Sequence, residues 1–335
     1  DERNTFCNDK EKADESLFSL WVYDFESRLE IAETNRDLIT GFKTDGVHYV
    51  NLDVCIYEKK ISKHEVNLVA FKNVFTDEEY CYSGDGALEN FVLFMIQHNS
   101  GKNICIAHNA AGYDTRLLFS KVKSMNQKVS MAPIMRGGKF MQLTINSNLI
   151  FRDSLLHVKG SLKSLAKDFC DGLLEKGYFP HLFNSTENYG YVGPIPDKKY
   201  FDLSFSVRNQ KEMDDFDAWY ATWAGRDDWN FDNELSKYCK NDVDVLQKIV
   251  KGYHDVAVAK FGMSPWFNAT APSFVHEVFL VKLAQDLELP DKKENMEEYK
   301  TKMKELAWDE YWAVLQPNEY WFARKALRGG RTDIR

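Results

Sequence analysis

The sequence predicts an α/β domain in which helices flank a mixed sheet, followed by a mainly helical C-terminal segment. Two short apolar runs, residues 17–23 and 104–107, are rich in strand formers and too short for buried helices. Amphipathic helical patterns alternate with such runs, and beyond residue 253 the pattern is helical. At 335 residues, the chain exceeds the size at which one hydrophobic core stops growing. We therefore expect one large domain with an appendage.

Strand and helix patterns follow one another along the chain. Residues 1–16 are polar and charged, so we expect a flexible tail. Alternating hydropathy predicts strands over residues 46–60 and 64–73, and a hairpin over 139–156 that turns at 146–148. The two glycines at 137–138 predict a further hairpin turn. Apolar spacing predicts helices over residues 86–97, 114–122, 162–169, 231–253, 273–287 and 292–315. Residues 170–229 form the long stretch that we expect to be irregular.

Two carboxylates end the first apolar run. Asp24 and Glu26 are two residues apart, so on a strand their side chains point to the same face. Adjacent carboxylates repel each other, and a hard divalent cation with oxygen ligands relieves that repulsion. The alternative is a strand end that runs into a polar turn, since a pair of acids with this spacing is common.

A second group of polar residues follows the apolar run 104–107. Asn109, Tyr113 and Asp114 lie where a strand gives way to a helix, the edge at which open α/β sheets bind ligands. Asn and Asp also cap helices, which is the alternative for either of them. Capping does not account for the whole group beside a second acidic strand end.

The third group lies in the predicted helix 231–253. Tyr238 and Asp242 are four residues apart and share the apolar face of that helix. An Asp on an apolar face is costly to bury without a partner. Asp244 points elsewhere, and we expect it to be solvated.

In this order, the three groups match the DxE, Nx(2–3)(F/Y)D and YxxxD motifs of the DEDD exonucleases of the tyrosine subclass. Further segments, FRDSL (151–155), LKSLAKDF (162–169), KGYFPHLFN (176–184), NYGYVGPIP (188–196) and YCKNDVDVL (238–246), resemble the 3′–5′ proofreading domain of protein-primed family B DNA polymerases. Such polymerases occur in Polinton-like elements, linear plasmids and small DNA viruses. The resemblance implies an RNase H-like α/β fold over residues 17–253 and a helical segment, 254–335, that leads to a polymerase domain. ALRGGRTDIR (326–335) resembles the joining motif, although Leu327 stands where a tyrosine is usual. We expect a piece of a longer parent chain.

The resemblance also implies a two-metal mechanism with Mg²⁺ or Mn²⁺. Asp24 would bridge both ions, Glu26 and Asp242 would complete the first site, and Asp114 would hold the second through water. Tyr238 would orient the attacking water, because a tyrosine hydroxyl with a pKa of about 10 is a weak base at neutral pH. Lys176 would lie near the scissile phosphate. The residues that would bind single-stranded DNA are Ser27, Asn109, Tyr113, Ser154 and Leu155. For Leu155, core packing is the alternative.

Charge and cysteine usage fit this interpretation. The 43 Lys and Arg against 51 Asp and Glu give a net charge of −8, yet residues 115–167 carry ten basic residues and one acid, Asp153. Such a stretch predicts a phosphate-tracking surface, with a solvated basic face as the alternative. The cysteines show no paired spacing, which favours reduced, buried thiols over a disulfide framework. They are Cys7, Cys55, Cys81, Cys105, Cys170 and Cys239.

We therefore expect an intracellular protein that is neither secreted nor inserted in a membrane, because no apolar run approaches a membrane span. By resemblance it would act in the nucleus or in a viral or element replication compartment, with the mitochondrion as an alternative. Its partners would be a single-stranded DNA 3′ end and a terminal-protein primer. Two other functions stay open: a catalytically weak module that binds DNA or a terminal protein, and a DEDD nuclease that acts on RNA.

Overall fold

A seven-stranded mixed sheet forms the centre of the molecule. A computed structural model of the chain describes residues 18–39, 42–44, 48–50, 55–76, 78–98, 101–125, 128–170, 177–203, 209–286, 297–298 and 301. In the order β5-β4-β1-β6-β9-β8-β7, the strands are β5 (Glu79–Ser83), β4 (Cys55–Asn73), β1 (Phe18–Ile39), β6 (Lys102–Ala107), β9 (Leu149–Asp153), β8 (Lys139–Ile145) and β7 (Met131–Arg136). β1, β6 and β9 are parallel neighbours, and the outer strands pair antiparallel.

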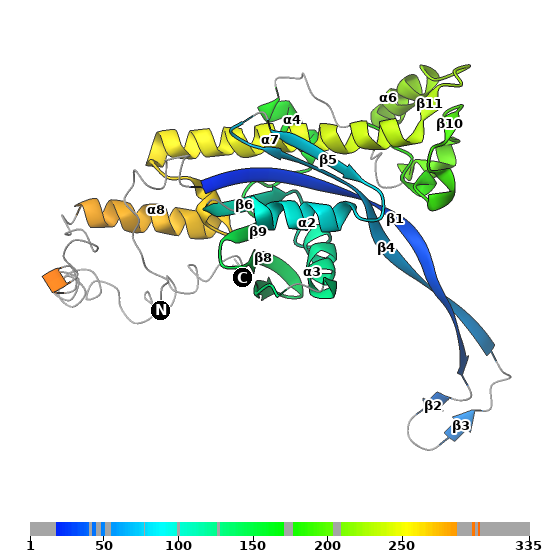
Figure 1. Cartoon of the computed structure of the whole chain (residues 1–335), viewed down its shortest axis with the longest axis horizontal. Coiled ribbons are helices and arrows are strands. Elements are labelled where there is room, and N and C mark those ends of the chain that lie inside the picture. The colour runs from blue at the N-terminus through cyan, green and yellow to red at the C-terminus, as the bar shows by residue number, and fades with distance from the viewer. Residues whose placement is uncertain are drawn as a thin grey trace.

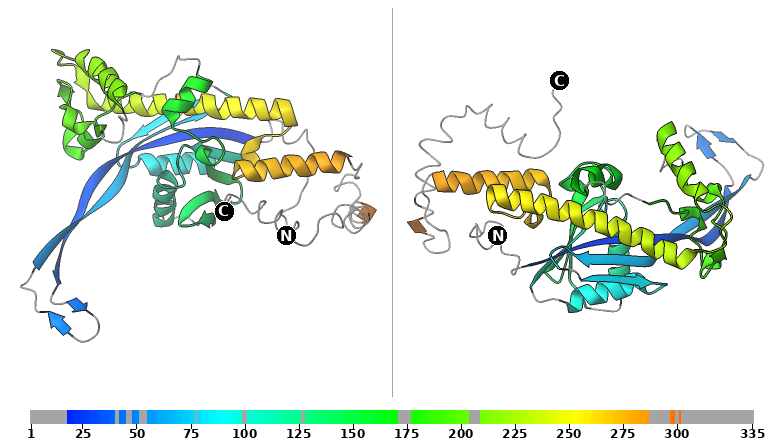
Figure 2. Two further views of the ribbon diagram at one scale, coloured as in Figure 1. Left: turned by 180° about the vertical axis from the view of Figure 1, so that it is seen from behind. Right: turned by 90° about the horizontal axis from the view of Figure 1, so that it is seen from above.

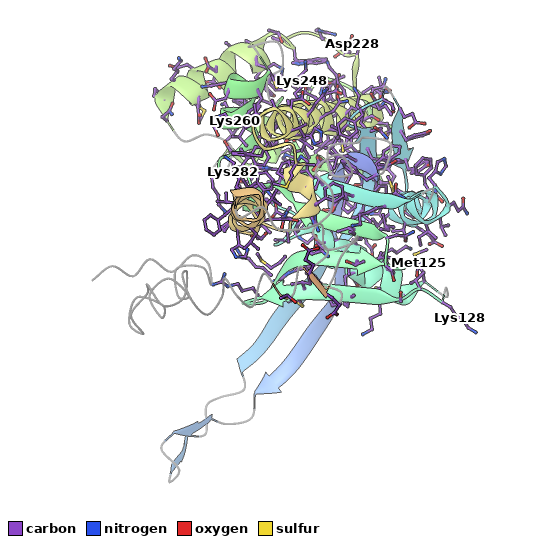
Figure 3. All side chains as sticks on the ribbon, turned by 90° about the vertical axis from the view of Figure 1, so that its left-hand side faces the viewer. Met125, Lys128, Asp228, Lys248, Lys260 and Lys282 are labelled. Carbon is purple, nitrogen blue, oxygen red and sulfur yellow. The ribbon has the colours of Figure 1, made fainter. Side chains whose placement is uncertain are left out.

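Helices cover both faces of this sheet. α2 (Ala87–Gln97) and α3 (Asp114–Ser124) pack on one face, and α7 (Phe231–Phe261) runs along the other with α4 (Leu162–Phe169) beside it (Figure 1). In the view from above in Figure 2, α7 lies obliquely across the body of the sheet. Side chains crowd the space between α7 and the sheet (Figure 3). The predicted α/β fold, a mixed sheet flanked by helices, is confirmed.

β1 separates two hydrophobic cores because its side chains alternate between the faces of the sheet. Trp21, Tyr23 and Phe25 join the core beneath α2 and α3. Leu20 and Val22 join the core beneath α7. The next two residues in that second series are Asp24 and Glu26, so both carboxylates lie on the α7 side, where the apolar series stops.

Beyond the body of the sheet, β1 and β4 continue together as a long two-stranded ribbon (Figure 1). The small pair β2 (Phe42–Thr44) and β3 (His48–Val50) lies at its far end. The pairing of β1 with β4 shifts register between Glu26 and Ser27, where Asn67 is the extra residue on β4. Such a bulge increases the local twist and re-aims nearby side chains.

The remaining elements surround α7. They are η2 (Ser154–Leu156), η3 (His181–Phe183), η4 (Thr186–Asn188), η5 (Lys198–Tyr200), η6 (Pro265–Phe267), α6 (Gln210–Ala221), α8 (Ala271–Asp286) and the short pair β10 (Val192–Gly193) and β11 (Trp229–Asn230). The expectation of irregular structure over 170–229 was wrong for α6, a helix that buries only Phe216 among its residues. Met213, Phe216, Trp219 and Tyr220 do recur at helical spacing in this acidic segment, so the period that predicts a helix is present in the sequence.

Several local predictions are confirmed. α4 has the predicted bounds, and Gly137 and Gly138 form the β7–β8 turn with positive φ values of 55° and 76°. The β8–β9 turn contains Asn146 and Ser147, with φ values of 50° and 66°. The tail 1–16, the helix predicted over 292–315 and the motif at 326–335 lie outside the described residues, apart from the short helical pieces at 297–298 and 301. Cys105, Cys170 and Cys239 are buried free thiols, and Cys81 is half-buried.

Candidate functional site

All three motifs meet at one cavity of about 900 Å³. Its wall includes the carboxylates of Asp24 and Glu26 from β1, Asp114 from the first turn of α3, and Asp242 from α7. Tyr238 of α7 lines it as well. The structure thus brings together five predicted catalytic residues that lie up to 218 positions apart in the sequence. Lys176, the sixth, lies outside the described residues.

The helix α7 supplies its two residues from the face that it buries against the sheet. Leu235, Cys239 and Val243 pack into the core beneath α7, and Tyr238 and Asp242 belong to the same buried face. Asp242 is 3% exposed, and Tyr238 is 7% exposed. Asp242 lines the same cavity as Asp24 and Glu26, and a cation among these carboxylates would relieve their mutual repulsion.

Cys239 stands beside this pair of carboxylates. Its sulfur donates to the backbone oxygen of Asp24 at 3.5 Å and lies 3.8 Å from Oδ2 of the same residue. Ligand atoms of Asp24, Glu26 and Cys239 all lie within 4.8 Å of one another. Burial, followed by the charges of Asp24 and Glu26, raises the pKa of the Cys239 thiol. A protonated thiol is a donor, so the oxygen atoms of the carboxylates form the ligand set, which suits a hard cation such as Mg²⁺ or Mn²⁺.

Asp114 is 6% exposed at the start of α3. Burial raises the pKa of its carboxyl to about 7, its own backbone N–H opposes that shift, and the charge of Asp153 adds to it. Burial disfavours the ionised form of this carboxyl, and a nearby cation would stabilise that form. The donor set of the cavity therefore fits divalent metal ions.

His181 is a cavity residue that the sequence motifs did not single out. Its Nδ1 lies 3.7 Å from Oε2 of Glu26, and its ring packs edge-on to Tyr238 with centroids 5.2 Å apart. Phe179 contacts the same tyrosine ring at 5.6 Å. These contacts hold the Tyr238 ring between an aromatic neighbour and the carboxylates.

The predicted DNA-binding residues divide into two groups. Asn109, Tyr113 and Leu155 line the cavity. Ser27 and Ser154 are not on its wall. Ser154 is 1% exposed, so a strand in the cavity does not reach it directly.

These two serines lie behind residues that do line the cavity. The Ser154 hydroxyl pairs with Nδ1 of His108 at 2.8 Å, and the Ser27 hydroxyl makes a short hydrogen bond with the hydroxyl of Tyr113. Leu155 is half-buried on the wall, which departs from the alternative of pure core packing.

Asp153 holds the loops that carry these residues. Its Oδ1 accepts from the backbone N–H groups of Asn109 and Leu155, both at 2.8 Å, and its Oδ2 accepts from Ala111 at 3.1 Å. The carboxylate is 2% exposed. Asn109 adopts a left-handed backbone with φ of 62°, a conformation that Asn tolerates better than most residues.

The basic stretch does not form one continuous surface. Lys163 and Lys167 of α4 line the cavity, but Arg152 is buried and donates to Gln142 at 2.9 and 2.8 Å. Burial lowers the pKa of Arg152 to about 9, which leaves it charged at neutral pH. Lys121 pairs with Glu89 at 2.9 Å. The prediction of a basic face is therefore wrong for Arg152.

With this geometry in place, comparison with known proteins decides the family. Residues 95–335, more than half of the chain, match the family model of DNA polymerase type B, organellar and viral. The chain belongs to this polymerase family. The resemblance to family B DNA polymerases inferred from the sequence is confirmed.

Two curated relatives of this type B polymerase chain are similar over most of its length. A probable DNA polymerase of Neurospora intermedia is 28% identical over 213 residues, which is 59% of the chain and 21% of that protein. A probable DNA polymerase of Ascobolus immersus is 24% identical over 290 residues, 82% of the chain and 21% of that protein. The chain thus spans about a fifth of the length of these relatives.

Among solved structures, phi29 DNA polymerase complexed with single-stranded DNA aligns with 81% of the type B polymerase chain and 36% of its own length. The identity is 12% and the TM-score is 0.42.

In the part of the chain that the structure describes, no helix combines the length and apolar character needed to cross a membrane.

Proposed function

We propose that this chain carries a 3′–5′ exonuclease that acts on single-stranded DNA ends, the proofreading part of a protein-primed family B DNA polymerase. The observation that carries the proposal is the convergence of Asp24, Glu26, Asp114, Tyr238 and Asp242 on one cavity. Membership of a DNA polymerase family supports DNA as the substrate class. Residues 17–253 would form the exonuclease, and residues 254–335 would lead to a polymerase domain in a longer parent chain.

Asp24, Glu26, Asp114 and Asp242 would hold two Mg²⁺ or Mn²⁺ ions. When bound, such ions generate a hydroxide nucleophile from water and stabilise the charge of the leaving oxygen. Tyr238 would orient the attacking water through its hydroxyl, in a ring position fixed by Phe179 and His181. Lys176 would offset charge near the scissile phosphate.

The single-stranded DNA would lie against a polar and aromatic wall of the cavity. Tyr113 can stack on a base, and Asn109, the most exposed of the predicted ligands, can bond sugar or phosphate oxygens. Leu155 adds an apolar contact from η2. Lys163 and Lys167 of α4 also line the cavity and would offer two cations to phosphates. Ser27 and Ser154 would act through Tyr113 and His108 rather than on the strand.

The test is degradation of a 5′-labelled single-stranded DNA oligonucleotide with Mg²⁺ or Mn²⁺. The wild type should give a ladder that shortens from the 3′ end, and the Asp24→Ala/Glu26→Ala variant should leave the oligonucleotide intact. A matched control, Asp214→Ala/Asp227→Ala, removes two exposed acids from α6 and the loop after it and should cut normally.

Each alternative has its own outcome in the same assay. Binding of the oligonucleotide without metal-dependent cleavage would support a binding module and refute the nuclease. Degradation of an RNA oligonucleotide of the same sequence, with the DNA left intact, would identify a nuclease of RNA. A terminal-protein primer remains a proposed partner, tested by co-purification with the longer parent polymerase.

A further inference from the structure

Three side chains from three elements meet beside the cavity. Ser27 lies on β1, His64 lies on β4, and Tyr113 ends the turn that precedes α3. The Tyr113 hydroxyl lies 2.8 Å from Nδ1 of His64, and Ser27 contacts both, at 3.2 Å to His64 and by a short hydrogen bond to Tyr113. The three polar atoms therefore form a closed triangle.

One assignment of protons makes two of these three contacts hydrogen bonds and leaves the 3.2 Å contact between Ser27 and His64 without a proton. The Ser27 hydroxyl donates to the Tyr113 oxygen, and the Tyr113 hydroxyl donates to Nδ1 of a neutral His64 that carries its proton on Nε2. The imidazole ring also stands perpendicular to the tyrosine ring, with centroids 5.3 Å apart and an interplanar angle of 90°. The hydrogen bonds hold the tyrosine hydroxyl, and an edge-to-face contact of this kind also restrains the plane of the ring.

Of these three residues, only Tyr113 lines the cavity. Ser27 and His64 hold it from the side of the sheet. The imidazole of His64 is exposed, so a role in the core does not explain its contacts. Its contacts instead define the position of one aromatic ring on the cavity wall.

The triangle also lies where the β1–β4 ribbon leaves the body of the sheet (Figure 1). The bulge at Asn67 is next to it, and Asn67 and Asn184 exchange hydrogen bonds at 2.7 and 3.3 Å. Asn184 also donates to the Ser27 backbone oxygen at 3.1 Å. Buried, mutually bonded amides of this kind fix the path of β1 at Ser27, so the ribbon base is a rigid support for the triangle.

We infer that His64 is a positioning residue for single-stranded DNA. Together with Ser27, it fixes the Tyr113 ring in the plane that stacks on a base of the strand in the cavity. The inference rests on the proposed function, because it takes a single-stranded nucleic acid as the occupant of the cavity. It adds a residue of the ribbon base to the strand-binding machinery.

The test is a double-mutant cycle with His64→Ala, Tyr113→Phe and the two combined. We measure the dissociation constant for a single-stranded DNA oligonucleotide, and KM and kcat for its degradation. Tyr113→Phe should raise KM about fivefold, the equivalent of one lost hydrogen bond, with kcat changed less than twofold. His64→Ala should raise KM about threefold in the wild-type background and by less than about 1.5-fold in the Tyr113→Phe background, where only the ring contact is left to lose.

Two further variants separate positioning from folding. His64→Gln keeps a polar group that can pair with the tyrosine, and it should restore KM to within about twofold of wild type. His276→Ala, which removes an exposed imidazole on α8, should have no effect.

The outcomes separate this inference from the function on which it rests. The role of His64 would be overturned if the two changes in KM multiply in the double variant, or if His64→Ala leaves KM unchanged. Neither result would contradict the proposed nuclease activity. A wild type that neither binds nor degrades the oligonucleotide would overturn both.

Discussion

Replacement of Asp153 by Asn tests how the cavity wall is built. The carboxylate accepts three backbone N–H groups, two at 2.8 Å through Oδ1 and one at 3.1 Å through Oδ2. An amide keeps one acceptor oxygen but turns a donor toward the N–H of Ala111. Asp153→Asn therefore removes one buried hydrogen bond and leaves a donor without a partner.

The magnitude follows from these contacts. A buried donor left unsatisfied costs about 1–3 kcal/mol, and the two surviving bonds lose roughly half their strength because the acceptor is no longer charged. Loss of the charge also relieves repulsion with Asp114, whose pKa is raised in part by Asp153, and this offsets part of the loss. We expect the free energy of unfolding to fall by about 2–5 kcal/mol.

The measurement is urea-induced unfolding followed by circular dichroism at pH 7. Asp227→Asn, the same chemical change at an exposed site, should stay within about 0.5 kcal/mol of wild type. Asp153→Ala should be less stable than Asp153→Asn, because all three N–H groups then lose their acceptor. A stability of Asp153→Asn within about 0.5 kcal/mol of wild type would refute the view that this carboxylate organises the loops.

Three further changes test other parts of the structure. Burial lowers the pKa of His157 to about 4, below its unfolded value of about 6.5, so the unfolded state binds the extra proton and stability falls as pH drops from 6.5 to 4, by about 3 kcal/mol in all. In His157→Gln, urea midpoints measured at pH 7 and pH 4.5 should lose that part of the dependence, and an unchanged difference would contradict it. Cys239→Ala should keep the Mg²⁺ concentration for half-maximal nuclease activity within about threefold, because a hard cation selects oxygen ligands; a tenfold rise would make the thiol a ligand. Lys163→Ala/Lys167→Ala should weaken binding of single-stranded DNA and reduce the slope of log affinity against log salt by about 1.4, whereas Lys248→Ala on the outer face of α7 should leave the slope unchanged. Equal slopes for the wild type and the double variant would show that the DNA strand does not contact these two lysines.

The carboxylates could be predicted from the sequence because each motif depends on a local period. Alternation along a strand places Asp24 and Glu26 on one face, and the helical period places Tyr238 and Asp242 on one face. These relations depend only on the local strand or helix and not on how the rest of the chain packs. Only the meeting of the three motifs at one cavity is a tertiary fact, and motif order in a resembling family supplied it.

The supports of the site depend on tertiary neighbours and could not be predicted in this way. Asp153 accepts from two separate loops, and His64 reaches Tyr113 across 49 positions of sequence. Cys239 is one of several buried residues on α7, and only the fold shows that its sulfur lies 3.8 Å from Oδ2 of Asp24. A residue type with no special spacing gives no indication of such contacts before the fold is known.

Asp244 shows the same limit in the opposite direction. We expected it to be solvated, since it points away from the face that holds Asp242, and that expectation was incomplete. Its Oδ1 lies 2.7 Å from Nζ of Lys72 on β4, and the same lysine lies 3.7 Å from Glu79. The helical period predicted its direction correctly, but only the packing of α7 across β4 could supply its partner.

The location of the cavity follows from the way in which β1 is buried. Between Phe18 and Val22 this strand has an apolar core on each face, so a carboxylate there would be surrounded by hydrocarbon. At position 24 the series that faces α7 stops being apolar, and the cavity begins. α7 is also buried along much of its length, so its buried face can carry an acid only where the cavity replaces the apolar core. Asp242 lines that cavity. Moving the first carboxylate one step earlier, as in Val22→Asp/Asp24→Val, would therefore destabilise the fold rather than shift the site, since residue 22 is fully buried.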